Sequence, residues 1–278
     1  MGTLFVVATP IGNLEDVTLR ALRVLREADL LLAEDTREVR KLLDRHGVAA
    51  RPVSLHAHNE ARRQGEALAA LAAGGRVALV SDAGTPLVSD PGERLVAAAA
   101  AAGHAVEAVP GASAALAALV VSGLPAQRFT FLGFLPRRAS ERERLLARLR
   151  DAPETLVLFE SPRRLAATLR ELAERLGDRR ACVARELTKR YEEVARGRLG
   201  ELALHFADGA RGEVTLVVEG GAEASVAEDD VDAEIRARLA AGGRAREIAA
   251  ALAAATGLPR RTLYARALAL GRAPRGGA

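Results

Sequence analysis

Cysteine, lysine and long apolar runs are all scarce in this chain of 278 residues. Cys182 is the single cysteine, so neither a disulfide framework nor a cysteine-built metal site is possible, and we expect a small buried residue there. The histidines lack metal-ligand spacing apart from His56 and His58, which we interpret as loop residues, so no metal is predicted. No apolar run approaches membrane-spanning length and no signal peptide is evident. We therefore expect a cytoplasmic globular protein with no membrane partner.

Arginine replaces lysine almost throughout the chain. Among 40 basic residues only Lys41 and Lys189 are lysines. Arginine suits phosphate recognition, although a coding bias alone would give the same ratio. The distribution of charge is more informative, because nine arginines and one acidic residue, Glu247, lie between Ile235 and the end of the sequence. This excess of positive charge favours contact with nucleic acid.

Short apolar runs alternate with helix-like segments over the first 121 residues. These runs are residues 4–8, 30–34, 77–81 and 105–109. The alternation predicts an α/β domain with a parallel sheet, residues 1–121. A second series of strands, with fewer helices between them, predicts a second domain with partly antiparallel pairing, residues 122–222. Its strands are residues 129–134, 155–161, 181–186, 193–199 and 214–220.

A third unit is predicted after an acidic linker that follows Gly220. Residues 245–270 read as a helix, a short turn containing Gly257 and Pro259, and a second helix. This is the outline of a helix-turn-helix, which is also common as a simple packing module. We predict a small helical domain at residues 231–273 and favour RNA as its partner because of its arginines.

The stretch SDAGTPLVSDPG, residues 81–92, follows a buried strand and combines two Ser-Asp pairs with two glycines and two prolines. Each of these residue types favours turns. The same composition also suits a rigid loop at the carboxyl end of a strand, where open α/β sheets bind their ligands. Local sequence alone leaves both interpretations open.

Other strand ends carry polar motifs without a dinucleotide fingerprint. TPIGN contains Pro10 and Gly12 but no G-x-G-x-x-G, and AEDTR contains Glu34 and Asp35. Asp35 or Thr36 is also suited to cap the following helix. The absence of the glycine fingerprint argues against a nucleotide bound in the usual Rossmann manner.

Three further motifs occur along the first 220 residues. In VPGASA, Ser113 either offers its hydroxyl to a ligand or caps the following helix. In FESPRR, Arg163 and Arg164 begin a helix, where the helix dipole disfavours cations, and this indicates an external anion. In RELTKRYEE, charged residues that include Glu186 and Lys189 crowd one strand end, as a solvated charge run also would.

Taken in order, these motifs resemble a known family. TPIGN, AEDTR, SDAGTPLVSDPG, VPGASA, LGFLPRR, FESPRR, ELTKRYEE and GEVTLVVEG match the ribosomal RNA small subunit methyltransferase I group, the 16S rRNA (cytidine-2′-O)-methyltransferases of the tetrapyrrole methylase superfamily. The likeness covers nearly the whole chain. It implies a two-domain tetrapyrrole-methylase-like α/β fold, with the donor cleft between the two domains, and a C-terminal helix-turn-helix-like domain. Arg163, where relatives often carry histidine, departs from the pattern, as does the Arg190–Tyr191 pair.

The resemblance also implies a cofactor and partners. S-adenosylmethionine is the expected methyl donor, 16S rRNA of the small ribosomal subunit the expected substrate, and the decoding region the expected target. A homodimer is the expected assembly. By analogy, the donor-binding residues are Pro10, Gly12, Asp82, Gly84, Thr85, Pro86, Ser113 and Ala114.

The expected reaction is in-line transfer of a methyl group to a ribose 2′-hydroxyl, with alignment of the reactants supplying much of the rate. Four residues are candidates for accepting the hydroxyl proton: Glu34, Asp35, Glu186 and Lys189. Lys189 is the preferred candidate, with Glu186 as its partner, because an amine is used where arginine is otherwise the rule. The alternatives are a small-molecule methyltransferase on the same scaffold and a non-enzymatic nucleic-acid-binding protein.

Overall fold

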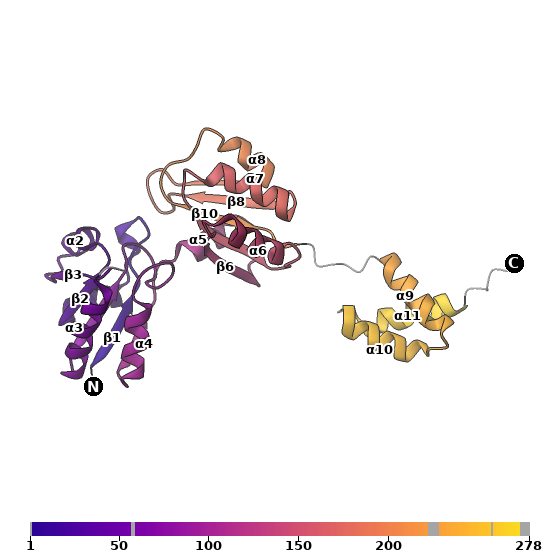
Figure 1. Ribbon diagram of the computed structural model, residues 1–278, viewed down its shortest axis with the longest axis horizontal. Coiled ribbons are helices and arrows are strands. Elements are labelled where there is room, and N and C mark those ends of the chain that lie inside the picture. Colours follow the sequence, from indigo (N-terminus) through magenta and orange to yellow (C-terminus); the bar gives the residue numbers. More distant parts are fainter. Residues whose placement is uncertain (1, 57–58, 222–227, 257, 273–278) are drawn as a thin grey trace. The chain divides into compact units, whose positions relative to one another are not determined.

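The computed structural model of this chain describes residues 2–56, 59–221, 228–256 and 258–272 and shows two compact units (Figure 1). The α/β body comprises Met1–Arg150 and Glu154–Gly220, and the helical unit comprises Gly221–Ala278 with Asp151–Pro153. Among the described residues, every helix is too short or too polar to cross a lipid bilayer.

The first sheet of the body has the strand order β3-β2-β4-β1-β5, and all its described pairings are parallel. Its strands are β1 (Thr3–Val7), β2 (Leu30–Ala33), β3 (Pro52–Ser54), β4 (Arg76–Val80) and β5 (Ala105–Val109). The predicted parallel sheet is confirmed. The apolar runs do not predict β3, because this strand is three residues long, begins with proline and is only partly buried.

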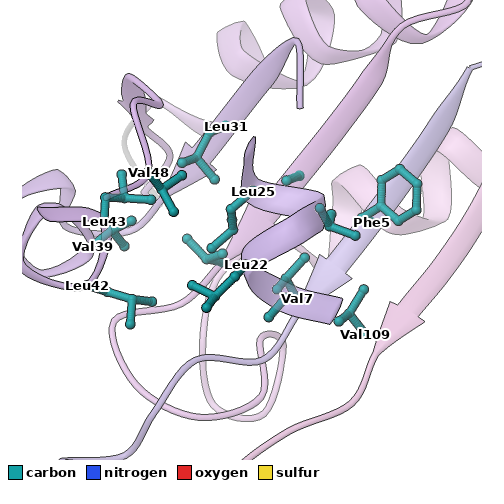
Figure 2. Packing of buried hydrophobic residues seen from close by; sticks show 14 of the residues in the cluster. Phe5, Val7, Leu22, Leu25, Leu31, Val39, Leu42, Leu43, Val48 and Val109 are labelled. Atoms are coloured by element: carbon teal, nitrogen blue, oxygen red, sulfur yellow. The ribbon is translucent and has the colours of Figure 1, made fainter. Parts of the chain in front are cut away.

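Alternate residues of the central strands pack on opposite faces of the first sheet. Val7 and Val80 join the cluster of α1 and α2 (Figure 2), whereas Leu4 and Leu79 join the cluster of α3 and α4. The helices of this part are η1 (Leu14–Asp16), α1 (Leu19–Glu27), α2 (Thr36–Arg45), α3 (Glu60–Ala72) and α4 (Glu93–Ala101). Both faces are therefore covered, as a parallel sheet requires, and the loops at the strand ends remain available for a site.

The second sheet has the order β6-β7-β10-β8-β9, in which only the β6–β7 pair is parallel. This confirms the partly antiparallel pairing. Its strands are β6 (Phe129–Phe134), β7 (Thr155–Glu160), β8 (Arg180–Arg185), β9 (Glu193–Arg198) and β10 (Val214–Val218). Its helices are α6 (Ala139–Leu149), α7 (Leu165–Leu176) and α8 (Leu199–His205), with α7 packed against both others.

Helix α5 (Ala114–Ser122) packs on the second sheet although it follows the last strand of the first. Ala118 and Leu119 share a core cluster with Val157, Val217 and Cys182, and the cysteine is buried as expected. The division at residue 122 stays a prediction; the packing of α5 favours a boundary before residue 114.

The helical unit consists of α9 (Glu228–Ala240), α10 (Ala245–Thr256) and α11 (Arg260–Arg272). Ile235, Leu252 and Leu263 contribute one side chain from each helix to a common core. Arg266 on α11 pairs with Asp232 on α9 at 2.9 Å. Helices α10 and α11 pack on each other and give the predicted helix-turn-helix outline.

Candidate functional site

A cavity of about 230 Å³ in the α/β body is lined by loops and strand ends from both sheets. The loop after β4 and the start of α5 form one part, and the ends of β6, β7, β8 and β10 form the other. The lining residues are Ile11, Ala83, Gly84, Thr85, Val88, Ser89, Asp90, Ser113, Ala114, Phe134, Phe159, Glu160, Ala184, Leu187, Glu213, Val214 and Thr215. Apolar walls with a few convergent polar groups are typical of small-molecule sites.

Four of the eight residues predicted to bind the donor line this cavity: Gly84, Thr85, Ser113 and Ala114. The other four, which lie in the same loops but outside its lining, are Pro10, Gly12, Asp82 and Pro86. None of the four predicted catalytic residues, Glu34, Asp35, Glu186 and Lys189, lines the cavity. The loops were therefore identified better than the individual side chains, and the assignment of roles remains a prediction.

Gly84 fixes the loop after β4 against the end of β1. Its φ angle is +77°, a conformation that side chains disfavour, and an added Cβ would lie 3.2 Å from Cγ2 of Ile11. Its backbone N–H and C=O both bond to Thr9, at 3.1 and 2.8 Å. These two bonds hold the loop against the end of β1, and Gly84 itself forms part of the cavity wall.

The start of α5 is fixed against the same loop. Thr85 Oγ1 donates to the carbonyl of Ala112 at 3.2 Å, and Ser113 caps α5 by accepting from the N–H of Leu116 at 3.5 Å. At the other end of α5, Nε of Arg196 donates to the carbonyls of Val121 and Ser122 at 3.1 and 3.2 Å. Ser113 therefore both caps the helix and lines the cavity.

Gly12 brings the loop after β1 into contact with the loop after β8. A Cβ at Gly12 would lie 2.5 Å from Cγ of Lys189 and 2.9 Å from the carbonyl of Leu187. The N–H of Asn13 donates to Oγ1 of Thr188 at 3.0 Å. No larger residue fits at this crossing, so Gly12 supports the cavity from outside its lining.

Backbone strain gathers in the two loops that follow β4 and β8. Within the described parts of the chain, the non-glycine residues with positive φ are Leu87, Ser89, Glu186 and Thr188, at +73°, +72°, +51° and +66°. Such conformations persist where the surroundings enforce them, and they cluster at functional sites. These loops are thus held in specific shapes beside the cavity.

Acidic side chains converge at the ends of β2 and β4. Burial is the main cause that raises the pKa of Glu34 to about 7, with further contributions from Asp90, Asp82 and Asp35. Burial also raises the pKa values of Asp82 and Asp90 above their usual range. Asp82 accepts the N–H of Asp35 at 2.6 Å, and Asp90 lines the cavity. The group creates a negative potential suited to a cationic ligand.

Asp35 behaves differently from its neighbours. Hydrogen bonds from the side chain and backbone N–H of Arg37 lower the pKa of Asp35 to about 2. Its Oδ1 also caps α2, accepting from the N–H of Arg37 at 2.8 Å. Asp35 is therefore a helix cap held as a carboxylate, as its position before α2 predicted.

Lys189 bridges two carboxylates after β8. Its Nζ lies 2.9 Å from Oε1 of Glu186 and 3.1 Å from Oε2 of Glu213, a lining residue of the cavity. Burial opposes the charge, but these hydrogen bonds raise the pKa of Lys189 above its usual value. The bonds from Lys189 and from the N–H of Glu213 lower the pKa of Glu186. This geometry favours a fixed ammonium over a proton acceptor.

Sequence reasoning assigned no role to several lining residues, among them Phe134, Phe159, Glu160 and Glu213. Each lies in a motif that had been noticed at a strand end: LGFLPRR, FESPRR or GEVTLVVEG. The Phe134 and Phe159 rings are 5.7 Å apart. Their motifs were a usable signal, but the pairing of β6, β7 and β10 was needed to bring them together.

Two family models match the sequence. The model for tetrapyrrole (corrin/porphyrin) methylases matches residues 3–203, and that for the RsmI C-terminal HTH domain matches residues 225–271. The chain belongs to the tetrapyrrole methylases. Its fold and its C-terminal domain are therefore those that the motifs implied.

Curated relatives define the group more narrowly. The protein named ribosomal RNA small subunit methyltransferase I from Micromonospora olivasterospora is 48% identical over 95% of this chain and 85% of its own length. The protein of that name from Mesorhizobium japonicum is 49% identical over 96% and 92%. The one from Thermotoga maritima is 47% identical over 221 residues, 79% of this chain and 99% of its own. The chain is a methyltransferase of this group.

Solved structures share the fold at lower identity. A diphthine synthase superimposes with a TM-score of 0.63 at 19% identity, covering 79% of this chain and 90% of that one. A uroporphyrin-III-C-methyltransferase from Thermus thermophilus gives 0.56 at 26% identity, covering 82% and 98%. The fold is thus common to proteins named for different substrates, and it does not by itself fix the substrate.

Proposed function

We propose that this methyltransferase transfers the methyl group of S-adenosylmethionine to the 2′-hydroxyl of a cytidine in 16S rRNA, in the decoding region of the small ribosomal subunit. The observation that carries the proposal is the cavity built from SDAGTP and VPGASA in a chain 45–49% identical to proteins named for small-subunit rRNA methylation. A small-molecule acceptor is the alternative on this fold, but the arginine-rich helical unit favours RNA.

The donor suits the charge and shape of the cavity. S-adenosylmethionine supplies an electrophilic methyl group on a sulfonium and also carries an ammonium and a carboxylate. Asp90 and Glu213, which both line the cavity, would bind the ammonium. The start of α5 at Ser113 and Ala114 offers the positive end of a helix dipole to the carboxylate. Asp82 and Glu34 extend the negative potential that favours a cation.

Of the four predicted residues, Glu34 has the pKa best suited to accepting the proton of the ribose hydroxyl. A general base works best with a pKa near the working pH, and Glu34 has one of about 7. Asp35 is too acidic, Glu186 is hydrogen-bonded by two donors, and Lys189 is held as an ammonium. Glu34 also interacts electrostatically with Asp90 in the cavity wall.

Single-turnover methylation of purified small subunits and of naked 16S rRNA tests the reaction and its acceptor. Mapping of the methylated nucleotide should find a cytidine 2′-O-methyl group. Glu34→Gln should lower the rate about 100-fold, as loss of a general base does, whereas Asp35→Asn serves as the neighbouring control. If wild-type enzyme transfers methyl groups only to small molecules, the RNA proposal is wrong.

The pH dependence gives the sign of the Glu34 contribution. The base must be deprotonated, so kcat/KM for the donor should rise with pH through about 7. A bound cation lowers the pKa of a nearby carboxyl, so the same inflection in kcat should lie below 7. Glu34→Gln should remove this acid limb from both profiles.

A cytoplasmic homodimer belongs to the same proposal. Leu116 and Val120 lie four residues apart on α5 and are 52% and 74% exposed, so one face of this helix presents apolar surface. A second copy of the chain would cover it. Val120→Glu should shift the mass measured by light scattering from dimer to monomer; an unchanged mass would argue against this face.

A further inference from the structure

A second cavity, of about 550 Å³, lies between the loops that follow β6 and β7. Its walls contain three arginines, Arg137, Arg142 and Arg164, and one carboxylate, Glu160. The remaining lining residues are Phe134, Leu135 and Ser161. The side chains that line this cavity therefore give it a net positive charge, the opposite of the acidic group beside the donor cavity.

Glu160 is fully buried and does not act as a free negative charge. Its Oε1 accepts the N–H of Ser161 at 2.6 Å, and its Oε2 accepts from Oγ1 of Thr168 at 2.6 Å. Nη2 of Arg164 donates to the same Oε2 at 3.0 Å. A buried carboxylate with three donors is a support that fixes the Arg164 guanidinium at the wall of the cavity.

Arg142 is fixed in a similar way. Its Nε donates to both carboxylate oxygens of Glu171 at 3.0 and 2.9 Å, and its Nη1 donates to the carbonyl of Pro136 at 3.1 Å. Only 22% of its side chain is exposed. Arg137, by contrast, is exposed. The cavity thus combines two ordered guanidinium groups with one at its rim.

Phe134 and Glu160 line both cavities. The β6–β7 register shifts between Phe131 and Phe134, and Gly133 at the irregularity has a φ angle of +60°. A Cβ on Gly133 would lie 3.2 Å from Oγ of Ser89 in the donor cavity wall. The irregular end of β6 therefore places the arginine-lined cavity directly beside the donor cavity.

We propose that this second cavity binds a backbone phosphate of the RNA acceptor, next to the nucleotide that is methylated. Guanidinium groups match phosphate in planar, paired hydrogen bonds, and phosphate contacts fix the position of a nucleic acid. A ribose hydroxyl is flanked by phosphates in its own backbone, so a phosphate held beside Phe134 presents that ribose toward the donor cavity. The inference rests on the proposed function.

Arg137→Ala tests the site, because Arg142 and Arg164 also hold the fold through their carboxylate partners. Arg138→Ala is the matched control: it removes the same charge one residue away, outside the cavity lining, where Arg138 pairs with Glu141 at 3.1 Å. Arg137→Ala should weaken binding of small subunits or rRNA about tenfold, as loss of one charge-assisted bond does. Donor affinity, measured by calorimetry, should not change.

The salt dependence of RNA binding separates a phosphate contact from a structural effect. Removing one contact should reduce the slope of log affinity against log salt by about 0.7–0.9, and Arg138→Ala should leave it nearly unchanged. Arg137→Lys should restore the slope but only part of the affinity. If Arg137→Ala and Arg138→Ala bind rRNA equally well with equal slopes, the inference is wrong while the proposed function stands. A wild-type enzyme that methylates no rRNA would overturn both.

Discussion

The loops after β2 and β4 and the loops after β6 and β7 occupy equivalent places, at the carboxyl ends of parallel strands, but they carry opposite charge. The first pair contributes Glu34, Asp82 and Asp90, whose pKa values are all raised. The second pair contributes the arginines of the second cavity. Ligands bind at strand ends in this class of fold, and we propose that one set of ends binds a cationic methyl donor and the other an anionic acceptor.

The two groups also differ in how their charges are balanced. The arginines at the second cavity are held by Glu160 and Glu171, so their positions are set before any ligand binds. Burial and, to a smaller extent, the neighbouring carboxylates disfavour the charged forms of Glu34, Asp82 and Asp90 in the absence of a cation. We call the group of Glu34, Asp82 and Asp90 the acidic edge and the arginines of the second cavity the basic edge. The charge state of the acidic edge therefore depends more on a bound ligand than that of the basic edge does.

The largest effect is expected at the acidic edge, from Gly84→Val. A branched side chain is strained at a φ angle of +77°, and its Cβ would press on Ile11 at the cavity wall. Donor affinity measured by calorimetry should fall about 100-fold, equivalent to about 2.8 kcal/mol, while RNA binding persists.

Gly103→Val provides the matched control for strain. Gly103 has a φ angle of +78°, but a Cβ there would meet no atom within 4 Å. This variant should lose stability without losing donor affinity. Equal donor affinities for the folded Gly84→Val and Gly103→Val proteins would remove Gly84 from the donor site.

The next largest effect is expected on RNA alone, from truncation after Gly220. The body ends at Gly220, so this truncation removes the helical unit as a whole. A truncation within α9, for example after Asp232, would instead leave part of that helix without its Arg266 partner. Among the described residues of the helical unit, five arginines are exposed: Arg236, Arg244, Arg246, Arg260 and Arg261. Their loss should weaken rRNA binding about 30-fold and reduce the salt slope by roughly 3–4. Donor affinity should not change.

The Thermotoga maritima relative makes the truncation a fair test, since it aligns over only 221 residues yet covers 99% of its own length. A body of that size is therefore viable in the family. Full methylation efficiency of the truncated enzyme at raised salt would mean that the helical unit has a structural role, and the basic edge of the body would then carry RNA recognition alone.

A smaller effect, on stability, follows from the raised pKa of Glu34. The charged form is disfavoured in the folded state, so its cost is absent below pH 4.5, grows up to about pH 7 and is complete above it. At about pH 8, the free energy of unfolding of Glu34→Gln should therefore exceed that of wild type by roughly 1–2 kcal/mol, after allowance for solvent screening. Denaturant unfolding measures this difference. The two proteins should converge at about pH 4. If Glu34→Gln and wild type were equally stable at both pH values, the pKa of Glu34 would not be raised in the folded protein.

Much of the fold was predictable, because buried strands and helices leave periodic apolar patterns. The ten strands described in the body include nine that the sequence predicted, and the motif at residues 81–92 does form a cavity wall. The packing of α5 was not predictable, since its short apolar sequence fits either sheet. The raised pKa of Glu34 depends on its burial and on Asp90 and Asp82, which are distant in sequence. The Lys189–Glu213 contact depends on strand pairing.

The smallest effect is expected from Lys189→Arg, at the crossing of the loops after β1 and β8. The sequence predicted that Lys189 helps to deprotonate the ribose hydroxyl, and this stays a prediction. Because its hydrogen bonds to Glu186 and Glu213 raise its pKa, a permanent cation should serve there almost as well. The single-turnover rate of Lys189→Arg should stay within about threefold of wild type, with an unchanged pH profile.

Charge removal at the same position separates orientation from proton transfer. Lys189→Met leaves Glu186 and Glu213 without their shared cation and should weaken donor binding through Glu213, which lines the cavity. Lys41→Met is the control, since Lys41 pairs only with Glu38 on the exposed side of α2 among its described contacts. If Lys189→Arg loses the rate about 100-fold and shifts its pH dependence while keeping donor affinity, Lys189 transfers the proton and Glu34 does not. A rate near wild type would instead assign Lys189 to positioning Glu213. Glu34, in the acidic edge beside the donor cavity, would then remain the proposed acceptor of the proton.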